Sequence, residues 1–226
     1  MTIIVLTMQL HDATIEPGSK ILICGASGSG KTTFVFDLLR HGERLFSDVN
    51  SLRNVIFFYQ KWQPMYEENA SLVREFCNQP PSLDIIEDKT AAFQSSIVIL
   101  DDALPKLDSD LYSLFLVDAR HSGITVIFLS QSIFAQQKIY REISLNSNYV
   151  VLFKNPRSMK QIANFVLQCA SSNGQSEVIW KIIKKVYEKP YSYLFLDFSQ
   201  KSDENIKYRT DIFNSAIKVF CVNKVG

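Results

Sequence analysis

Long apolar runs, paired cysteines and internal repeats are all missing from this sequence of 226 residues. No apolar run is long enough to cross a bilayer, and the apolar segment 1–8 lacks the basic start and small-residue cleavage site of a signal peptide. The cysteines include no C-x-x-C pair, so neither a zinc site nor a disulfide framework is indicated. We therefore expect an intracellular protein in a reducing compartment, with no membrane span. The cysteines are Cys24, Cys77, Cys169 and Cys221.

Neither sign of charge dominates, since the formal net charge is +1. The hydrophobic fraction of 46% and the charged fraction of 21% are ordinary for a globular protein. Charge is unevenly distributed, because residues 154–226 carry 12 Lys and Arg against 6 Asp and Glu. Such a basic second part suits contact with a polyanion, or it is an ordinary solvated surface. Both interpretations stay open.

A glycine-rich stretch at residues 25–32 reads Gly-Ala-Ser-Gly-Ser-Gly-Lys-Thr, the pattern G-x-x-x-x-G-K-[ST] of a P-loop. A short apolar run at 21–24 precedes it and suits a buried parallel strand, and residues 33–40 can form a helix. In this context backbone N–H groups surround phosphate oxygens, with Lys31 at the β- and γ-phosphates and Thr32 on Mg²⁺. The predicted nucleotide-binding residues are Gly25, Ala26, Ser27, Gly28, Ser29, Gly30, Lys31, Thr32 and Thr33.

A second decisive stretch lies at residues 96–102, where four apolar residues are followed by two carboxylates. This is the pattern of a Walker B strand, which delivers its acids to the carboxyl edge of the sheet, where ligands bind. We expect Asp101 to hold Mg²⁺ near Thr32, and Asp102 to orient or deprotonate the attacking water. The alternative, an acidic turn at a strand end, is common elsewhere but fits poorly after a P-loop.

Residues 124–131 predict a further buried strand, which ends in Gln131. A glutamine there suits a sensor that hydrogen-bonds the γ-phosphate or the attacking water. A Walker B strand, a helix from 108–110 through Arg120, and a strand with a polar sensor form the layout of additional-strand P-loop ATPases. The sequence therefore predicts an α/β fold: a P-loop NTPase three-layer sandwich of the additional-strand class, with a mostly parallel central sheet and helices on both faces.

Several segments together resemble the viral genome-packaging ATPases of the FtsK/HerA superfamily. The nearest kind is the poxvirus type, which adenovirus-like and Polinton/Maverick elements also carry, and the resemblance covers most of residues 18–215. Its most specific parts are residues 131–134, 144–147 and 153–157. The segments that carry the resemblance read GASGSGKTT, IVILDD, RHSGITVIFLSQSIF, REISLNSNYVVLFKNPRS, YLFLDFS and YRTDIF.

This resemblance implies hydrolysis of ATP with Mg²⁺ by a homo-oligomeric ring that drives double-stranded DNA into a capsid, with a capsid portal or vertex protein as a partner. It places the protein in the nucleus or cytoplasmic virus factory of an infected cell, or with the virion. The chain departs from the family at Asp102, where the wider superfamily often has Glu. It also lacks a long added domain, so we expect DNA contacts to come from the core itself or its loops. The expected division is a single ATPase domain over 1–226, with an extension at 1–17, a core at 18–200 and a C-terminal segment at 201–226.

A ring ATPase needs a positive charge from the neighbouring subunit to stabilise the γ-phosphate during hydrolysis. Arg120 lies just before the sensor strand, where the superfamily commonly has an Arg, and is the first candidate. Arg141, Arg157 and Arg209 are alternatives, and a surface salt bridge is the competing role for each.

The remaining patterns predict structure more than chemistry. We expect strands at 2–10, 55–59, 149–153 and 193–198, the last being the final one, with one short helix around 67–77. A P-loop helix ends near 41–42 with Gly42 as its cap, and further helices cover 157–169 and 176–189. The lysines of the last helix either track DNA phosphates or face solvent. Trp62 and Tyr66 suit base stacking, although packing is the commoner role.

From these patterns we expect an ATP-hydrolysing motor that packages double-stranded viral DNA. Two alternatives stay open: a helicase or DNA-transfer pump of the same superfamily, and an ATP-binding switch or assembly module with little turnover.

Overall fold

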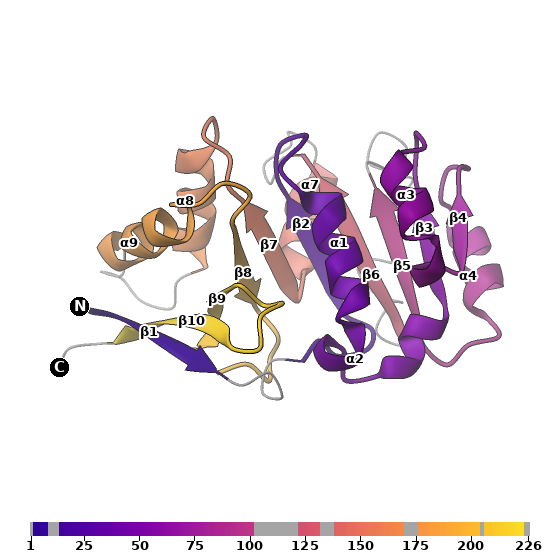
Figure 1. Cartoon of the computed structure of the whole chain (residues 1–226), viewed down its shortest axis with the longest axis horizontal. Helices are drawn as coiled ribbons and strands as arrows, with labels where there is room; N and C mark the ends of the chain where they lie inside the picture. Colours follow the sequence, from indigo (N-terminus) through magenta and orange to yellow (C-terminus); the bar gives the residue numbers. More distant parts are fainter. Residues whose placement is uncertain are drawn as a thin grey trace.

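A computed structural model describes residues 2–8, 14–101, 122–131, 138–169, 176–203 and 206–223. Asp102 and Arg120 lie outside these residues, as does the helix expected from 108–110 through Arg120. The described strands form one 10-stranded sheet in the order β1-β10-β9-β8-β7-β2-β6-β5-β3-β4. Figure 1 shows this sheet running across the molecule with helices packed against it.

Six neighbouring strands of the sheet are parallel, from β7 through β4. The central strand β2 (Lys20–Cys24) pairs with β7 (Tyr149–Phe153) on one side and β6 (Ile124–Ser130) on the other. Each of these strands is mainly apolar and is buried along its whole length, since both of its faces are covered. Next along the sheet come β5 (Ser96–Asp101), β3 (Val55–Phe58) and β4 (Glu75–Cys77).

The additional strand, β6, lies between the strand that precedes the glycine loop and the strand that ends in Asp101. This confirms the expected additional-strand layout. The other four strands are antiparallel and extend the sheet beyond β7 (Figure 1). They are β8 (Tyr193–Asp197), β9 (Tyr208–Thr210), β10 (Ile217–Asn223) and β1 (Thr2–Met8).

Helices cover both faces of the sheet, which confirms the three-layer prediction. One apolar core joins Ile21 and Ile23 of β2 to α1 (Lys31–Arg40), α2 (Gly42–Leu45) and α3 (Pro64–Glu68). The opposite core joins Leu22 and Cys24 to the helices of the other layer. Successive strand residues thus alternate between the two layers, as the pleat requires. The helices of this second layer are α4 (Leu83–Thr90), α7 (Lys138–Asn146), α8 (Met159–Gln168) and α9 (Ser176–Val186).

Three local predictions are wrong. The helix expected around 67–77 is instead the end of α3, a short 3₁₀ helix η3 (Ala70–Leu72) and strand β4. Gly42 does not cap α1 in a left-handed conformation, because His41 is the cap and Gly42 begins α2. The strand at 193–197 is not the last, since β9 and β10 follow it.

The predictions of the last two helices are confirmed. The helices α8 and α9 lie within the predicted ranges, and the apolar stripe of α9 is buried from Val178 to Tyr187. A second 3₁₀ helix, η2 (Val49–Arg53), precedes β3. No helix in the described ranges is both long and apolar enough to span a membrane.

Candidate functional site

The glycine loop connects the end of β2 to the start of α1 and is shaped by backbone that only glycine adopts without strain. Gly28 and Gly30 have φ angles of 74° and 100°, in the left-handed region. At Gly25 a Cβ atom would lie 2.5 Å from Ser29 Oγ and 2.7 Å from Phe153 Cβ, so no larger residue fits. Around Gly28 such an atom would meet nothing within 4 Å. The loop therefore stands open at its tip, as a cradle for an anion must.

Lys31 folds back over this loop. Its Nζ donates to the carbonyl oxygens of Gly25, at 2.8 Å, and of Ala26, at 3.2 Å. The side chain is buried, so the ammonium group is held at the loop and away from bulk water. Ser29 Oγ is also buried, and no hydrogen-bond partner for it is found among the described residues. A buried cation and a spare hydroxyl in one loop fit a bound polyphosphate.

Thr32 and Asp101 meet although 69 positions separate them in the sequence. The Thr32 hydroxyl lies 3.4 Å from Asp101 Oδ2, at the carboxyl ends of β2 and β5. Asp101 is 6% exposed. A hydroxyl and a carboxylate side by side are oxygen ligands that suit Mg²⁺.

Among the described residues no group of three His, Cys, Asp or Glu could hold a metal ion by itself. Magnesium commonly binds through one or two protein ligands plus phosphate oxygens and waters, so the Thr32 and Asp101 pair fits an ion that arrives with a nucleotide.

Tyr66 also contacts the Oδ2 atom of Asp101. Its hydroxyl donates to Asp101 Oδ2 at 2.9 Å, and it accepts a bond from Gln63 Nε2 at 3.1 Å. Tyr66 is 1% exposed, which contradicts base stacking by this residue and confirms packing, whereas Trp62 is exposed. Trp62 packs edge-on against Tyr66, with ring centroids 5.5 Å apart. No local pattern predicts the bond to Asp101, because Tyr66 on α3 and Asp101 on β5 are brought together only by the fold.

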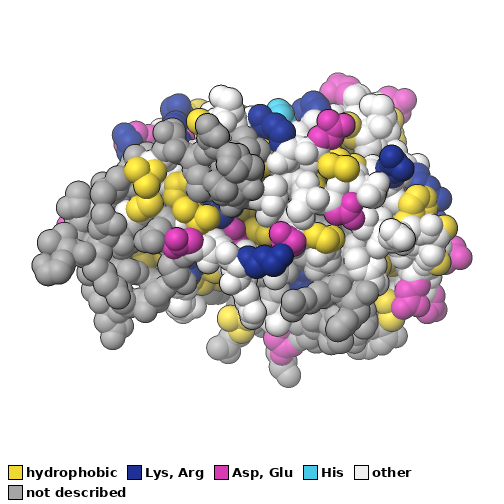
Figure 2. All heavy atoms as spheres, turned by 90° about the horizontal axis from the view of Figure 1, so that it is seen from below, with side chains coloured by type: hydrophobic (Ala, Val, Ile, Leu, Met, Phe, Trp, Pro, Cys, Tyr) yellow, Lys and Arg dark blue, Asp and Glu magenta, His cyan; other side chains and the backbone are white. Residues whose placement is uncertain are grey.

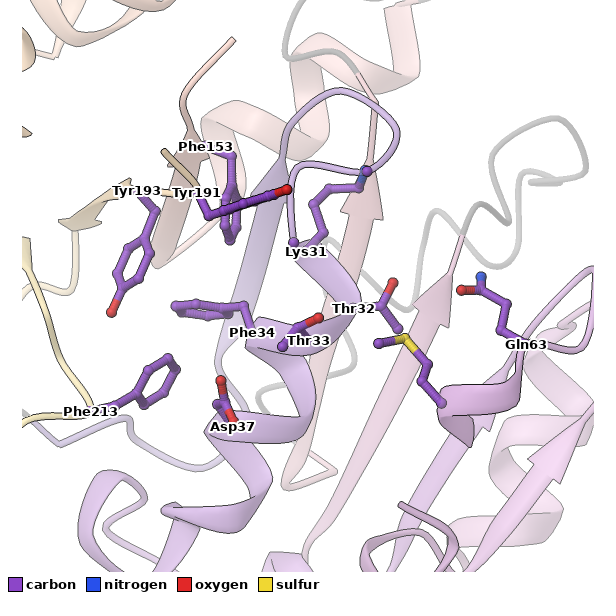
Figure 3. A pocket seen from close by; sticks show the side chains of 13 residues that line it. Lys31, Thr32, Thr33, Phe34, Asp37, Gln63, Phe153, Tyr191, Tyr193 and Phe213 are labelled. Carbon is purple, nitrogen blue, oxygen red and sulfur yellow. The ribbon is translucent and has the colours of Figure 1, made fainter. Parts of the chain in front are cut away.

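A cavity of about 460 Å³ opens beside the loop. Its walls come from both sides of the N-terminus of α1. Figure 3 shows the rings of Phe34, Phe153, Tyr191 and Tyr193 gathered on one side of Lys31, with Gln63 on the other side. Sequence analysis missed these aromatic residues. The full lining is Gly28, Gly30, Lys31, Thr32, Thr33, Phe34, Asp37, Gln63, Met65, Phe153, Tyr191, Tyr193 and Phe213.

Gln131 directly follows β6 and lies beside the loop. The amide of Gly25 donates to the carbonyl of Ser130 at 3.1 Å, which fixes the two strand ends together. The Gln131 side chain is exposed and lines a small second cavity with Gly25 and Asn155. It therefore sits next to the predicted phosphate site, without lining the large cavity.

Arg209 is unavailable to a neighbouring subunit, which rules out one arginine candidate. It is 1% exposed, and its Nη2 donates to Asp197 Oδ2 at 2.5 Å. Burial lowers the pKa of the guanidinium, and the Asp197 carboxylate opposes that shift. Arg157 is exposed and stays a candidate. The side chain of Arg141, like Arg120, lies outside the described part.

The lysines of α9 are exposed, and two of them pair with glutamates. Lys181 lies 2.6 Å from Glu177, and Lys185 lies 3.1 Å from Glu188. On the face seen in Figure 2, basic and acidic side chains are interspersed over the described surface. Local pairing of this kind favours an ordinary solvated helix face over a dedicated phosphate track.

No protein-family model and no curated protein sequence matches the chain. Among solved structures, the genome packaging NTPase B204 from Sulfolobus turreted icosahedral virus 2 in complex with ATP-gammaS aligns with a TM-score of 0.53 and 13% identity, over 82% of this chain and 95% of that one. The DNA-packaging ATPase B204 from Sulfolobus turreted icosahedral virus aligns with a TM-score of 0.52 and 15% identity, over 83% and 96%. At such identities the similarity shows the fold, and this chain has the α/β fold of a P-loop NTPase.

Proposed function

We propose that this protein is a Mg²⁺-dependent ATPase that moves double-stranded DNA into a viral capsid. The observation that carries the nucleotide part is the convergence of Lys31, Thr32 and Asp101 at one sheet edge, with Thr32 Oγ1 3.4 Å from Asp101 Oδ2. The packaging part is supported by the shared fold with viral genome-packaging NTPases and by the FtsK/HerA-like motifs.

In the proposed mechanism the loop amides between Gly25 and Thr33 surround the phosphates, and Lys31 exchanges its bonds to the Gly25 and Ala26 carbonyls for phosphate oxygens. Thr32 and Asp101 would hold Mg²⁺, which supplies charge neutralisation on the β- and γ-phosphates when bound. The loop and the metal ligands thus stabilise the charge that spreads over the transferred phosphoryl group.

Three further roles complete the proposal. Asp102 positions the attacking water, and Gln131, beside the loop, senses the γ-phosphate. Arg120 of a neighbouring subunit stabilises the charge on the γ-phosphate, so that turnover depends on a homo-oligomeric ring. Within that ring the chain acts as one ATPase domain over 1–226, and a capsid portal or vertex protein is its partner in an infected cell or virion.

Hydrolysis measurements separate this proposal from an ATP-binding switch. The Lys31→Ala variant should bind ATP weakly and lose turnover, because the loop then lacks its only lysine. Lys201→Ala is the matched control, since Lys201 is exposed and pairs with Glu16. Both variants should keep the wild-type thermal unfolding midpoint. Full turnover by folded Lys31→Ala would refute the proposal.

Duplex DNA tests the motor. Steady-state ATP hydrolysis should rise on addition of duplex DNA, and the stimulation should weaken steeply with added salt, because phosphate contacts release counterions. A switch would bind ATP without stimulation. A helicase would separate the strands of a free duplex, whereas a packaging motor would move the duplex intact.

A further inference from the structure

We propose that the aromatic pocket beside the loop binds the base of the nucleotide, with Tyr191 closing over it. We define the aromatic pocket as the part of the cavity formed by Phe34, Phe153, Tyr191, Tyr193 and Phe213. The inference rests on the proposed function in one respect, since it takes the loop as the site of the phosphates.

The glycine loop and the aromatic pocket belong to one continuous cavity. The loop residues Gly28 and Gly30 line the same cavity of about 460 Å³ as the aromatic residues. A polyphosphate held by the loop therefore carries whatever is attached to it into this space. The volume lies within the range of small-molecule sites, which is roughly 300–1,000 Å³.

The second argument is the chemistry of the walls. Phe34 packs edge-on against Tyr193, with ring centroids 4.8 Å apart, and against Phe153 at 5.8 Å. The ring centroid of Phe213 lies 5.0 Å from that of Phe34. Flat apolar walls of this kind suit a planar aromatic ligand, because bases stack on aromatic side chains. The base of a nucleoside triphosphate is the aromatic group that a phosphate loop would bring here.

The third argument is that the walls are fixed before any ligand arrives. Phe34 and Phe153 are both 3% exposed. The Tyr193 hydroxyl accepts a hydrogen bond from the amide of Ile212 at 3.0 Å, which sets the position of the ring. Little side-chain entropy remains to be lost on binding at these residues, and that favours affinity.

Tyr191 differs from the other four residues in its exposure and backbone conformation, which suit a residue that covers the bound base. Its side chain is 72% exposed, although it is a large aromatic residue at the rim of the pocket. Its φ of 56° lies in the left-handed region, which costs a non-glycine residue energy. The ring comes within 3.9 Å of the position that a Cβ on Gly30 would take.

The turn that carries Tyr191 is held on both sides. Ser192 Oγ donates to the carbonyl of Lys189 at 2.8 Å, and Lys154 N donates to the carbonyl of Ser192 at 2.9 Å. The strained backbone is therefore imposed by its surroundings, and the exposed ring stays next to the loop. A base in the pocket would cover this ring and remove its apolar surface from water.

The experiment compares two ligands, Mg-ATP and magnesium tripolyphosphate, by isothermal titration calorimetry. Tripolyphosphate offers the loop the same chain of phosphates but has no base. Wild-type protein should bind ATP more tightly than tripolyphosphate. Tyr191→Ala should weaken ATP binding about tenfold, which is about 1.4 kcal/mol, and leave tripolyphosphate binding unchanged. Tyr191→Phe should retain the wild-type affinity for ATP, because the ring and not the hydroxyl stacks.

Two controls keep the result interpretable. Leu145→Ala removes a side chain of matched exposure, 70%, that does not line the cavity, and should change neither affinity. Lys31→Ala should weaken both ligands, which would uphold the phosphate site separately from the base site. Equal loss of both ligands in Tyr191→Ala, loss of neither, or a wild-type protein that binds tripolyphosphate as tightly as ATP would each overturn the assignment of the base.

Discussion

Replacing Tyr66 by Phe tests whether the bond between its hydroxyl and Asp101 matters to the protein. The substitution removes only the hydroxyl that donates to Asp101 Oδ2 at 2.9 Å. The ring keeps its packing against Phe57 and Phe76, at centroid distances of 5.1 Å and 5.6 Å. The change in volume is small, so the effect should report on the hydrogen bond rather than on a cavity.

A hydrogen bond to a charged group contributes about 1.5–3 kcal/mol, and the carboxylate of Asp101 is buried. We therefore expect Tyr66→Phe to lower the free energy of unfolding by about 2 kcal/mol, measured by urea denaturation at neutral pH. Because Asp101 is then held less firmly beside Thr32, the Mg²⁺ concentration that half-saturates ATP hydrolysis should rise as well.

The control is Tyr59→Phe, in the same aromatic cluster. Tyr59 packs 5.5 Å from Tyr66, and no hydrogen bond of its hydroxyl to Asp101 is seen in the described structure. Loss of the Tyr59 hydroxyl should change the unfolding free energy by less than about 0.5 kcal/mol. If the two variants behave alike in both measurements, the Tyr66 hydroxyl does not position Asp101 and the reasoning fails.

Three more perturbations give expected outcomes. Gly123→Ala should destabilise the protein by about 2 kcal/mol or more in urea denaturation, because φ is 69° and the new Cβ would lie 2.5 Å from a backbone oxygen. Gly28→Ala has a similar φ of 74° but open space around the new Cβ, so it should cost only about 1 kcal/mol. Equal losses of stability in the two variants would contradict the role of the close contact at Gly123. Arg209→Met should cost about 3–5 kcal/mol, since Asp197 would be left charged and buried; a calorimetric melting temperature close to wild type would argue against it. Burial raises the pKa of the Cys24 thiol to about 12, so this thiol should resist iodoacetamide at pH 8 until the protein is denatured, and rapid labelling detected by mass spectrometry would show that the strand end opens.

The parallel half of the sheet and the glycine loop could be predicted from the sequence, because each produces a pattern within a short segment. Each central strand is covered on both faces, so it appears as an unbroken apolar run. The loop needs glycines at fixed spacing, and Asp101 is the last residue of its strand. Strand β6 was expected to carry Gln131 to the same edge, and the amide of Gly25 does bond to β6 at Ser130.

Other parts depend on contacts between distant segments, which no local pattern reveals. Strand β9 has three residues with Arg209 at its centre, and the buried Asp197 on β8 balances the charge of that arginine. The pocket joins Phe34 to Tyr191 and Phe213, from three separate parts of the chain. Each of these residues looked like ordinary core or turn, so their common location emerged only from the fold.

The pairing of β2 also sets the order in which the supports of the glycine loop can form during synthesis. The strand that ends at the glycine loop is complete at Cys24, yet its two neighbours in the sheet are residues 124–130 and 149–153. More than half of the chain must therefore leave the ribosome before β6 and β7 can pair with β2 on either side of this loop. Strand β1 waits longer still, because Thr2 pairs with Asn223, so β1 can join the sheet only after β10 has been made.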